Sequence, residues 1–479
     1  MNNIIIIGAG PAGLTAAYEL AKRERSSKVL EKSGHVGGIA RTESYKGYRF
    51  DIGGHRFYTK IKEVENIWRE LLGDDFLERP RISRIYYQGK FYHYPLKLSN
   101  TLMNLGIFTS FAVGLSYLQS QLFPYPEENT FEEWVSNRFG KKLYSIFFET
   151  YTEKVWGMPC SEISAEWAAQ RIKGLSLPVA VRNALFRYPD GKVKTLINSF
   201  EYPCLGPGMM WEAAQRYVEE RGGEVQLNTP VQKLVHDGKR VLYAVAMRGQ
   251  AAGQQQIPGS HFISSMPISE LIKCLEPSAP SDILAAANDL AYRDFLTVVL
   301  ILDRPELFPD NWIYVHEPEV RIGRIQNFKN WSPDMVPDLS KTSLGLEYFC
   351  SVGDDLWQME DEALIALGKR ELEQIGLASA QDVIDGVVVR QPKAYPIYNS
   401  TYQEHLEEIK DYLAGFENLQ TIGRNGMHKY NNQDLSKLAG ILAARNLLGE
   451  THDIWDVNTD QVYYEEKRVY HDALASDLR

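Results

Sequence analysis

The sequence predicts an α/β protein with a discontinuous Rossmann-type domain, an inserted helical region and an antiparallel β-sheet region. Three observations support this fold class. A continuous apolar run from Ile4 to Ile7 leads into a glycine turn and a helical stretch, as in a buried parallel strand followed by a helix. Residues 98–200 have mostly helical periodicity, broken by prolines. Residues 295–350 alternate in the manner of antiparallel strands.

The first unit carries a nucleotide-binding fingerprint. Gly8, Gly10 and Gly13 have the spacing G-x-G-x-x-G between strand and helix. The first glycine allows a tight turn, the second lets a pyrophosphate approach the backbone, and the third lets the helix pack on the strand. The helix N-terminus offers N–H groups to the phosphates. Glu31 ends the next strand, where an acid can hold a ribose hydroxyl. An ordinary glycine turn of a βαβ unit is the alternative.

The later elements follow in order along the chain. The glycine pairs Gly37-Gly38 and Gly53-Gly54 would let the backbone lie against a flat ligand, because they carry no side chain. We then expect a hairpin at 83–95, strands at 223–231 and 262–267 that return to the nucleotide domain, a helix at 361–373, a strand at 419–422, and a helix at 436–447 after the turn at 423–426.

These elements divide the chain into five predicted segments. The nucleotide-binding domain comprises residues 1–82, 206–290 and 415–479, the last part including the C-terminal tail. A mainly helical substrate region, residues 83–205, and an antiparallel substrate region, residues 291–414, are inserted into it. A chain of 479 residues is too long for one small core, which agrees with several substructures.

Composition excludes some classes of function. The formal net charge is −10, from 52 basic and 62 acidic residues, which argues against a nucleic-acid partner. The four cysteines stand far apart, so we expect free thiols in a reducing compartment and no metal site. The N-terminal apolar run lacks a basic flank and ends in the glycine turn. We therefore expect a fold element rather than a signal peptide, and a cytoplasmic protein.

One stretch, Leu102 to Leu122, is apolar enough to be considered as a membrane segment. Polar residues interrupt it: Asn104, Thr109, Ser110, Ser116, Gln119 and Gln121. No uninterrupted run reaches the roughly 18 residues of a membrane span, so we expect a buried or partly exposed helix and no transmembrane segment. A helix lying on a membrane surface is the alternative, which we favour less because the polar face of the stretch lacks Lys and Arg.

Separated motifs together resemble one family. The segment from Gly8 to Glu31, with Gly37-Gly38 and Arg41, resembles the FAD-binding domain shared by amine oxidases, phytoene desaturases and protoporphyrinogen oxidases, and Gly423-Arg424 fits the same fold. Within that superfamily the chain resembles the UDP-galactopyranose mutases over nearly its full length. The motifs that carry this resemblance are Gly53-Gly54-His55, Lys154-Val155-Trp156, Glu166 to Arg171, Trp312-Ile313-Tyr314 with Arg324, Ala394-Tyr395-Pro396, and Arg424 to Asp434.

The resemblance implies FAD as the cofactor, with the reduced form active and NAD(P)H as a candidate external reductant. It implies cofactor contacts from Gly8, Gly10, Pro11, Ala12, Gly13, Glu31, Lys32, Gly37, Gly38, Ile39, Arg41, Gly53, Gly54, His55, Val231, Ser265, Met266, Gly423, Arg424, Asp434, Leu435 and Ser436. It implies substrate contacts from Phe147, Trp156, Trp312, Tyr314, Tyr395, Tyr430 and Asn432, and catalytic roles for His55, Arg171 and Arg324.

The implied reaction converts the sugar of a nucleotide sugar between pyranose and furanose forms, through an adduct with N5 of the reduced flavin. The resemblance also implies a place in cell-surface polysaccharide biosynthesis. Arg171 and Arg324 suit a diphosphate, because guanidinium groups bind phosphate oxygens bidentately. Closure of the loop around Arg171, with Gly174 as a hinge, would exclude water. For each arginine taken alone the alternative is a surface ion pair, and for the tyrosines and tryptophans it is packing.

The residues leave the role of His55 and the identity of the substrate undecided. His55 is either an acid or base, or a residue that only orients backbone beside the flavin. The family has an aromatic residue and a glutamine after Tyr-Pro, whereas Tyr94-Pro95 is followed here by Leu96-Lys97. Thr152 also replaces a family asparagine. The second hypothesis is therefore an FAD-dependent oxidoreductase that removes hydride from a small molecule, and the third is a non-catalytic flavoprotein. A homo-oligomer is compatible with each.

Overall fold

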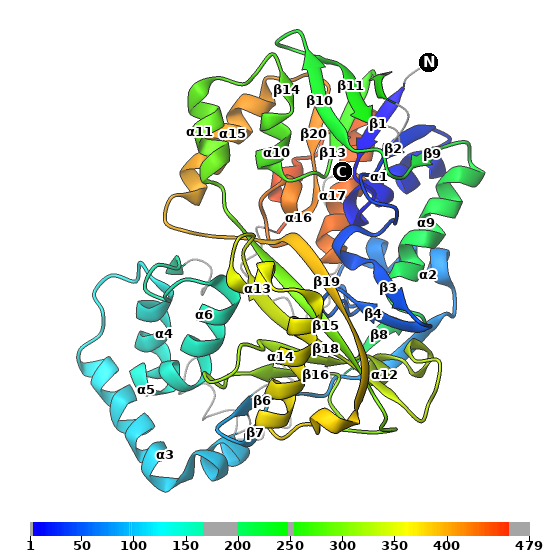
Figure 1. Cartoon of the computed structure of the whole chain (residues 1–479). Helices are drawn as coiled ribbons and strands as arrows, with labels where there is room; N and C mark the ends of the chain where they lie inside the picture. Colours follow the sequence, from blue (N-terminus) through cyan, green and yellow to red (C-terminus); the bar gives the residue numbers. More distant parts are fainter. Residues whose placement is uncertain (1–2, 95, 97, 166–198, 248–252, 459–479) are drawn as a thin grey trace.

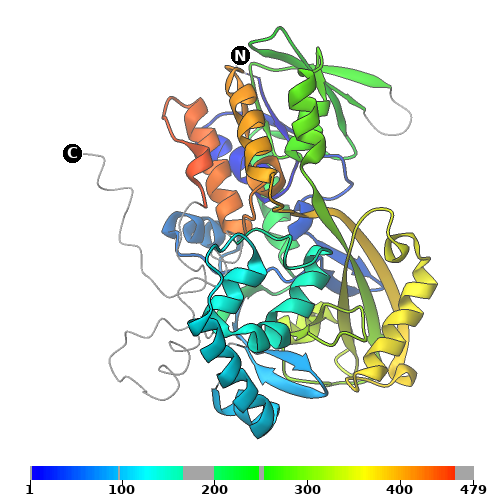
Figure 2. The ribbon, with the colours of Figure 1, turned by 90° about the vertical axis from the view of Figure 1, so that its left-hand side faces the viewer.

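The computed structural model describes residues 3–94, 96, 98–165, 199–247 and 253–458. Figure 1 shows three regions: a parallel sheet with its helices at the top, a long antiparallel sheet below, and a group of helices beside that sheet. Figure 2 views the molecule from the side of this helical group. The mixed α/β fold confirms the predicted fold class, whereas the boundaries of the five predicted segments remain predictions.

The parallel sheet joins strands from distant parts of the sequence. Its order is β20-β13-β1-β2-β9. The strands are β1 (Ile4–Ile7), β2 (Ser27–Leu30), β9 (Glu224–Gln226), β13 (His261–Ser264) and β20 (Leu419–Thr421). β1 pairs in parallel with β2 on one side and β13 on the other, and all four of its residues are buried. This double pairing explains the continuous apolar run. Strands β9 and β13 lie within the two segments expected to return to the nucleotide domain, 223–231 and 262–267, and β20 lies in the strand expected at 419–422.

Helices cover this sheet on both faces, and a second sheet lies beside it. One face is packed by α1 (Pro11–Lys22), α2 (Lys62–Leu72), α9 (Gly208–Glu220) and α17 (Gln433–Leu447). The other core contains α10 (Ile268–Lys273), α11 (Ser281–Asp289), α15 (Tyr402–Ala414) and the sheet β12 (Gln254–Pro258), β11 (Val241–Met247), β10 (Val231–His236) and β14 (Leu275–Glu276). A Cβ on Gly440 of α17 would overlap the carbonyl oxygen of Ala12, so α1 and α17 pack backbone to backbone.

The large antiparallel sheet has the order β19-β15-β18-β17-β16-β6-β7. Its strands are β6 (Ser83–Tyr87), β7 (Lys90–His93), β15 (Tyr292–Leu302), β16 (Trp312–Val315), β17 (Arg324–Asn327), β18 (Thr342–Cys350) and β19 (Val383–Pro396). The hairpin β6-β7 is confirmed, and it extends this sheet by a parallel pairing with β16. Short helices α12 (Phe328–Trp331) and α13 (Asp355–Gln358) and the longer α14 (Asp361–Gln374) lie against it.

Two small antiparallel strand pairs, the first of them a hairpin, lie between the main sheets. They are β3 (Thr42–Tyr45) with β4 (Tyr48–Asp51), and β5 (Phe76–Pro80) with β8 (Ser199–Pro203). The helical group contains α3 (Leu98–Leu122), α4 (Phe131–Phe139), α5 (Lys141–Tyr144) and α6 (Thr150–Trp156), with a π-helical turn at Ser145–Glu149 before α6. The described part of residues 98–200 is therefore mainly helical, as predicted.

Of the two expected forms, a buried or a partly exposed helix, α3 has the partly exposed one. The stretch is a helix, interrupted at Gly106, but only 11% of its most apolar window is buried. Within the described ranges, Asn100–Leu122 is the one helix long and apolar enough to cross a membrane, judged by length and composition alone. Although polar residues interrupt the stretch, its bulky apolar residues face outward rather than into the core.

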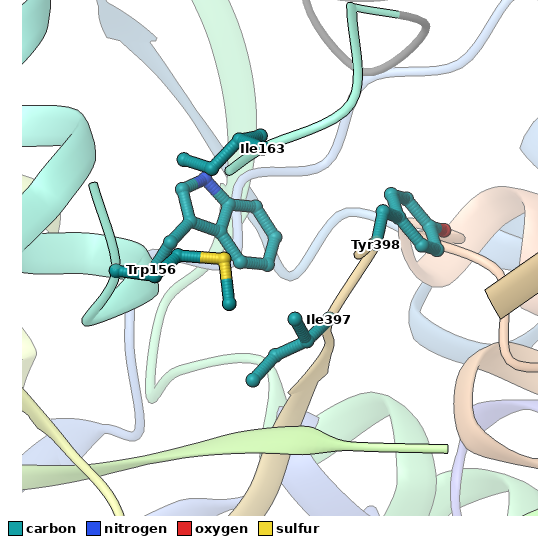
Figure 3. A pocket seen from close by; sticks show the side chains of 5 residues that line it. Trp156, Ile163, Ile397 and Tyr398 are labelled. Carbon is teal, nitrogen blue, oxygen red and sulfur yellow. The ribbon is translucent and has the colours of Figure 1, made fainter. Parts of the chain in front are cut away.

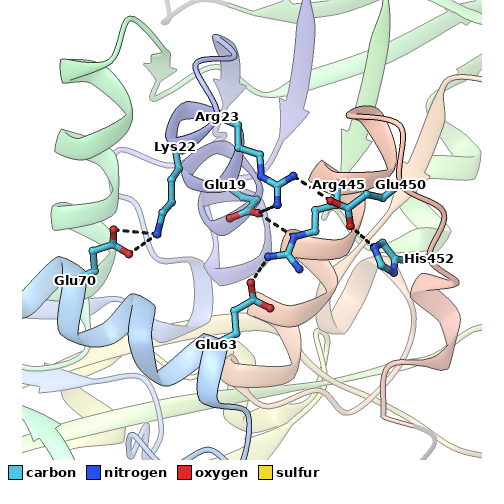
Figure 4. Close-up of polar contacts among 8 residues, drawn as sticks. All are labelled: Glu19, Lys22, Arg23, Glu63, Glu70, Arg445, Glu450 and His452. Atoms are coloured by element: carbon cyan, nitrogen blue, oxygen red, sulfur yellow. Dashed lines mark hydrogen bonds and ion pairs between the residues drawn. The ribbon is translucent and has the colours of Figure 1, made fainter. Parts of the chain in front are cut away.

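Ion pairs tie α1, α2 and α17 together (Figure 4). The guanidinium of Arg445 on α17 bonds to Glu19 of α1 at 3.0 Å and to Glu63 of α2. Arg23 also bonds to Glu19 at 3.0 Å and reaches Glu450. The side chain of Glu19 is only 6% exposed, so its charge depends on these partners. The network therefore fixes the helix that carries the glycine fingerprint.

Replacing Arg445 by Met should lower the free energy of unfolding by about 2–3 kcal/mol, because it removes one of the two arginines that neutralise the buried carboxylate of Glu19 and also takes the partner of Glu63 away. The control is Lys22→Met, which removes the exposed pair with Glu70 and should cost less than about 1 kcal/mol. Denaturant unfolding of the two variants checks both values. Equal losses would show that the network around Glu19 contributes no more than a surface pair.

Candidate cofactor and substrate site

The fingerprint turn leaves room for a ligand at the N-terminus of α1. Gly8 has a φ of +96°, which favours glycine, and a Cβ on Gly13 would overlap the carbonyl oxygen of Gly8. Gly10 is the N-cap of α1, has no side chain to cap the helix, and is followed by Pro11. The first N–H groups of a 12-residue helix therefore lie behind a turn with no side chain in front of it.

Glu31 lies directly against this turn. One carboxylate oxygen accepts the N–H of Ala9 at 2.7 Å, and the other accepts the N–H of Ser33 at 2.8 Å. The N–H of Thr229 donates to the carbonyl of Glu31, which brings the chain before Val231 alongside. Lys32 is exposed next to it. The carboxylate therefore stands at the carboxyl end of β2, where the fingerprint predicts a ribose.

The second glycine pair closes the other side of the turn. The N–H of Gly37 donates to the carbonyl of Ala9 at 2.8 Å, and a Cβ on Gly38 would lie 3.2 Å from the Cα of Gly10. Ile39 belongs to the same short 3-10 turn, Gly38–Ala40. Arg41 follows it and donates to the carbonyl of Gly38 at 2.8 Å. Two backbone segments distant in sequence thus touch with no side chains between them.

C-terminal residues complete this region. A Cβ on Gly423, the first residue of α16 (Gly423–Gly426), would lie 2.9 Å from the Cβ of Ala12. Ser265 donates through its N–H and its hydroxyl to the carbonyl of Ile7. The other predicted contacts stand nearby in sequence: Met266 follows Ser265, Asn432 is the N-cap of α17, and Asp434, Leu435 and Ser436 form its first turn. The glycines leave open a cradle that larger side chains would fill. Such an open cradle fits a dinucleotide.

Replacing Gly13 by Ala should abolish retention of a bound flavin, because its Cβ overlaps the Gly8 carbonyl and displaces the turn. The matched control is Gly114→Ala, also a helix glycine, whose Cβ would meet no atom within 4 Å. The visible absorbance of the purified proteins measures bound flavin. Full absorbance in the Gly13 variant would contradict the cradle.

The loop Gly53-Gly54-His55 faces the antiparallel sheet. A Cβ on Gly53 would lie 3.7 Å from an Arg324 nitrogen, and a Cβ on Gly54 would lie 2.9 Å from Nε2 of Gln326. His55 Nδ1 donates to the carbonyl of Gly53 at 3.1 Å, so Nε2 of the neutral ring is a bare acceptor. Burial, together with the nearby guanidinium groups of Arg424 and Arg324, lowers the pKa of His55 to about 3.

His55 should therefore stay neutral at every pH from about 5 to about 8. Histidine-selective NMR of the flavin-bound protein checks this, with His55→Gln used to assign the signal. An inflection near the ordinary pKa of 6.5 would contradict it. Because the folded pKa is lowered, the unfolded chain takes up the proton first. The stability that neutral His55 contributes is therefore present above 6.5 and is lost as the pH falls toward 3.

A buried ion pair stands beside this loop. Arg324 on β17 faces Glu347 on β18 in the sheet register, and Nη2 of Arg324 lies 2.5 Å from the Glu347 carboxylate. Gln326 donates to the other carboxylate oxygen at 2.9 Å. Glu347 has no exposed side-chain surface, whereas the side chain of Arg324 is 17% exposed. Burial opposes a charged Arg324, but the Glu347 carboxylate raises its pKa well above the ordinary value.

Tyrosine side chains gather around Arg324. Tyr314 is its register neighbour on β16, and the Tyr151 ring lies 5.4 Å from that of Tyr314. Tyr395 on β19 stacks on Tyr430 at 5.6 Å with an angle of 11°. Burial raises the pKa of Tyr151 and of Tyr395, so both hydroxyls stay protonated and can donate. The structure thus brings together four of the predicted residues, Arg324, Tyr314, Tyr395 and Tyr430.

Arg424 joins this group from the nucleotide-binding side. Its guanidinium carbon lies 4.8 Å from the centre of the Tyr430 ring, a cation–π distance. Its Nε donates to the carbonyl of Asn431 at 2.9 Å and its Nη1 to that of Ala394 at 3.2 Å. Arg424 therefore links the turn after β20 to the end of β19, where the two parts of the site meet.

Helix α6 is held against the sheet by two cations. Nζ of Lys154 donates to the carbonyls of Val315, Glu317 and Ile322, at distances from 2.6 to 3.3 Å. These carbonyls border the connection between β16 and β17, so Lys154 fixes the loop between Tyr314 and Arg324. At the same end of α6, Arg293 donates to the carbonyl of Val155, the residue after Lys154, at 3.1 Å. The Lys-Val-Trp motif therefore acts here through its lysine and its backbone.

Three predicted substrate residues lie in packed surroundings. Trp156 lines an apolar pocket with Met158, Ile163, Ile397 and Tyr398 (Figure 3). Phe147 is 5% exposed in the core of the helical group, edge-on to Tyr92. Trp312 stacks on Trp331 at 5.4 Å. The packing interpretation describes their observed contacts, and their roles as substrate contacts remain predictions.

Some residues of the site were not predicted from the sequence, and some predicted residues lie outside the described part of the chain. Arg171 and Gly174 fall outside the described residues, as does Lys97. Sequence reasoning missed Glu347 and Tyr151. A glutamate inside the apolar run of β18, a strand buried along its whole length, was an available indication. Tyr151 lies three residues before Lys154, on the same side of a helix. In the described part of the chain, no group of three His, Cys, Asp or Glu could hold a metal ion.

Comparison with known proteins agrees with this arrangement. The model of the flavin-containing amine oxidoreductases matches residues 11–428. A protein of Klebsiella pneumoniae named as a probable UDP-galactopyranose mutase is 30% identical over 175 residues, which span 34% of this chain and 43% of the relative. The dTDP-fucopyranose mutase of Escherichia coli is 28% identical over 171 residues, 34% of this chain and 44% of the relative. The chain thus aligns with less than half the length of either protein.

Solved structures share the fold over nearly the whole chain. A crystal structure of reduced UDP-galactopyranose mutase has a TM-score of 0.83 at 22% identity, covering 96% of this chain and 98% of that one. A putrescine oxidase has a TM-score of 0.61 at 15% identity, covering 94% and 99%. At such identities the likeness shows the fold alone. The family match runs from Pro11, the first residue of α1, over most of the chain and makes the cofactor a flavin: the chain belongs to the flavin-containing amine oxidoreductase family.

Proposed function

We propose that this protein is an FAD-dependent enzyme that acts on a nucleotide sugar and interconverts its pyranose and furanose forms, as a UDP-galactopyranose mutase does. One observation carries the proposal: a charged arginine, paired with the fully buried Glu347, lies largely buried beside the Gly53-His55 loop and has Tyr151, Tyr314 and Tyr395 as its neighbours. A cavity built to remove hydride from an apolar substrate has no need of a buried cation. A diphosphate leaving group does need one, because its charge must be held while it is detached from the sugar.

The side chains divide the work between them. Arg324, oriented by Glu347, offers its remaining N–H groups to a phosphate oxygen, and the protonated hydroxyls of Tyr151 and Tyr395 donate to the same dianion. Arg171 is the second proposed phosphate ligand. Neutral His55, bonded through Nδ1 to Gly53, holds the loop against the flavin and offers only an acceptor nitrogen. Bound FAD would supply the nucleophilic ring chemistry that these side chains lack.

The cofactor contacts are proposed from the cradle. Gly8 to Gly13 and Gly37-Gly38 would face the pyrophosphate, and Glu31 would exchange its backbone partners for a ribose hydroxyl. Reduced FAD as the active form, NAD(P)H as the reductant, a cytoplasmic location and a homo-oligomer remain predictions. The sugar and the base stay open, because the residues after Tyr94 differ from the family pattern.

Removing the guanidinium of Arg324 should weaken nucleotide-sugar binding by about 10- to 100-fold, the value of a hydrogen-bonded charge contact. Arg324→Met is best measured in a Glu347→Gln background, so that no buried carboxylate is left alone, and compared with Glu347→Gln itself. Calorimetry gives the affinity, and absorbance gives the flavin content, which should not change. Arg321→Met is the control, since Arg321 pairs with Asp355 on the surface. Flavin loss with unchanged affinity would contradict the role.

The reaction itself is tested with dithionite-reduced protein and a panel of nucleotide sugars, by chromatography for furanose products. The second candidate is a hydride-removing oxidoreductase, favoured by the family match and by a 25% identical relative, the 1-hydroxycarotenoid 3,4-desaturase of a Flavobacterium. That candidate predicts that substrate alone bleaches the oxidised flavin. Two results together support the mutase: furanose products form only with the reduced protein, and the substrate does not bleach the oxidised flavin. Bleaching without furanose products would overturn it.

A further inference from the structure

The outer surface of α3 is apolar and faces away from the rest of the chain. Phe108 is 89% exposed, Met103 81%, Ile107 79% and Phe111 68%. We call this surface the α3 face; its members are Met103, Ile107, Phe108, Phe111, Leu115, Leu118 and Leu122. In Figure 1, α3 is the outermost helix at the lower left, away from the flavin cradle. A contiguous patch of this size marks a site of interaction.

The polar side of α3 is already occupied by its own domain. Asn104 donates to the carbonyl of Phe91 at 2.7 Å, and Gln121 donates to that of Asn137 at 2.8 Å. The hydroxyl of Ser116 accepts the N–H of Lys142 at 2.9 Å. These bonds hold the inner side of α3 to β7, α4 and α5 along its length. The helix therefore cannot leave the domain to cross a membrane without breaking them, and it presents only its outer face.

We propose that the α3 face lies in the surface of a phospholipid bilayer, with the helix axis in the plane of the membrane. No charged residue occurs from Leu98 to Pro126. The most apolar 18 residues within Asn100–Leu122 have a mean hydropathy of 1.4 and are 11% buried. A contact between two soluble proteins has a polar rim around its apolar centre. Between Ile107 and Leu118 the exposed residues of α3 are all apolar, a composition that suits acyl chains better.

Neighbouring elements supply the basic groups that α3 itself lacks. Lys90, at the start of β7, donates to the carbonyl of Asn104 on α3. Lys142 of α5 is exposed, and its backbone bonds to Ser116. Both lysines are thus bonded to the inner side of α3, and in the proposed orientation their ammonium groups meet the phosphates of anionic lipids beside the helix. This arrangement answers the objection from the sequence, which was the absence of Lys and Arg on the helix.

Flotation of the full-length, flavin-bound protein with vesicles tests the proposal. Vesicles of phosphatidylcholine should retain the protein, and vesicles that also contain phosphatidylglycerol should retain more. The triple variant Phe108→Gln, Phe111→Gln, Leu118→Gln should lose about tenfold or more in binding to both, since it removes three large apolar contacts. Lys90→Gln with Lys142→Gln should remove only the preference for anionic vesicles.

The matched control places three glutamines at exposed apolar positions elsewhere: Leu242, Leu339 and Val352, which are 45%, 61% and 63% exposed. It should float like the unchanged protein. Flavin absorbance and melting temperature establish that each variant is folded. Equal loss in the control would overturn the proposal, as would failure of the unchanged protein to float with either vesicle. So would a protein that forms dimers which the α3 triple variant abolishes, but that ignores vesicles, since a second copy would then cover the face.

Discussion

The buried pair of Arg324 and Glu347 is the interaction on which the site depends. Burying a charged guanidinium is costly unless an opposite charge compensates it, and Glu347 provides that charge from the adjacent strand. The register of β17 and β18 sets the two residues opposite each other, and the register of β16 adds Tyr314 to the same row. A shift of one residue would turn these side chains to the other face of the sheet. Sheet register and anion recognition are therefore one constraint.

Two separate frameworks meet at this pair. The parallel sheet ends in the glycine turn around α1, and the antiparallel sheet ends in the tyrosine cluster. The loop Gly53-Gly54 lies where they touch, close to Arg324 and Gln326. Lys154 and Arg293 hold α6 against the antiparallel sheet. The region between them contains hydroxyl donors, a paired cation and a neutral histidine. Such a site is suited to hold an anion while the cofactor does the chemistry.

Local patterns predicted the nucleotide-binding part well. The fingerprint from Gly8 to Gly13 depends on residues near in sequence, and its glycines touch backbone, so the spacing is sufficient to find it. The strands expected at 262–267 and 419–422 were also found, as β13 and β20 of the parallel sheet. Glu347 was missed for the opposite reason: its function comes from a partner on another strand. The sequence left open whether α3 is buried or partly exposed, since hydropathy reports composition and not which side of a helix the domain covers.

The sequence by itself determined the nucleotide fold, the position of the glycine cradle and the identity of the chemical groups available, because strand, turn and helix preferences act over a few residues. Only the tertiary structure decided which groups work together. It placed Arg324 with Glu347, Tyr151 and Tyr395, it gave Lys154 the role of a clamp, and it packed Trp156 in an apolar pocket. These pairings join residues far apart in the chain, and they follow from sheet register and long-range packing, which no local pattern encodes.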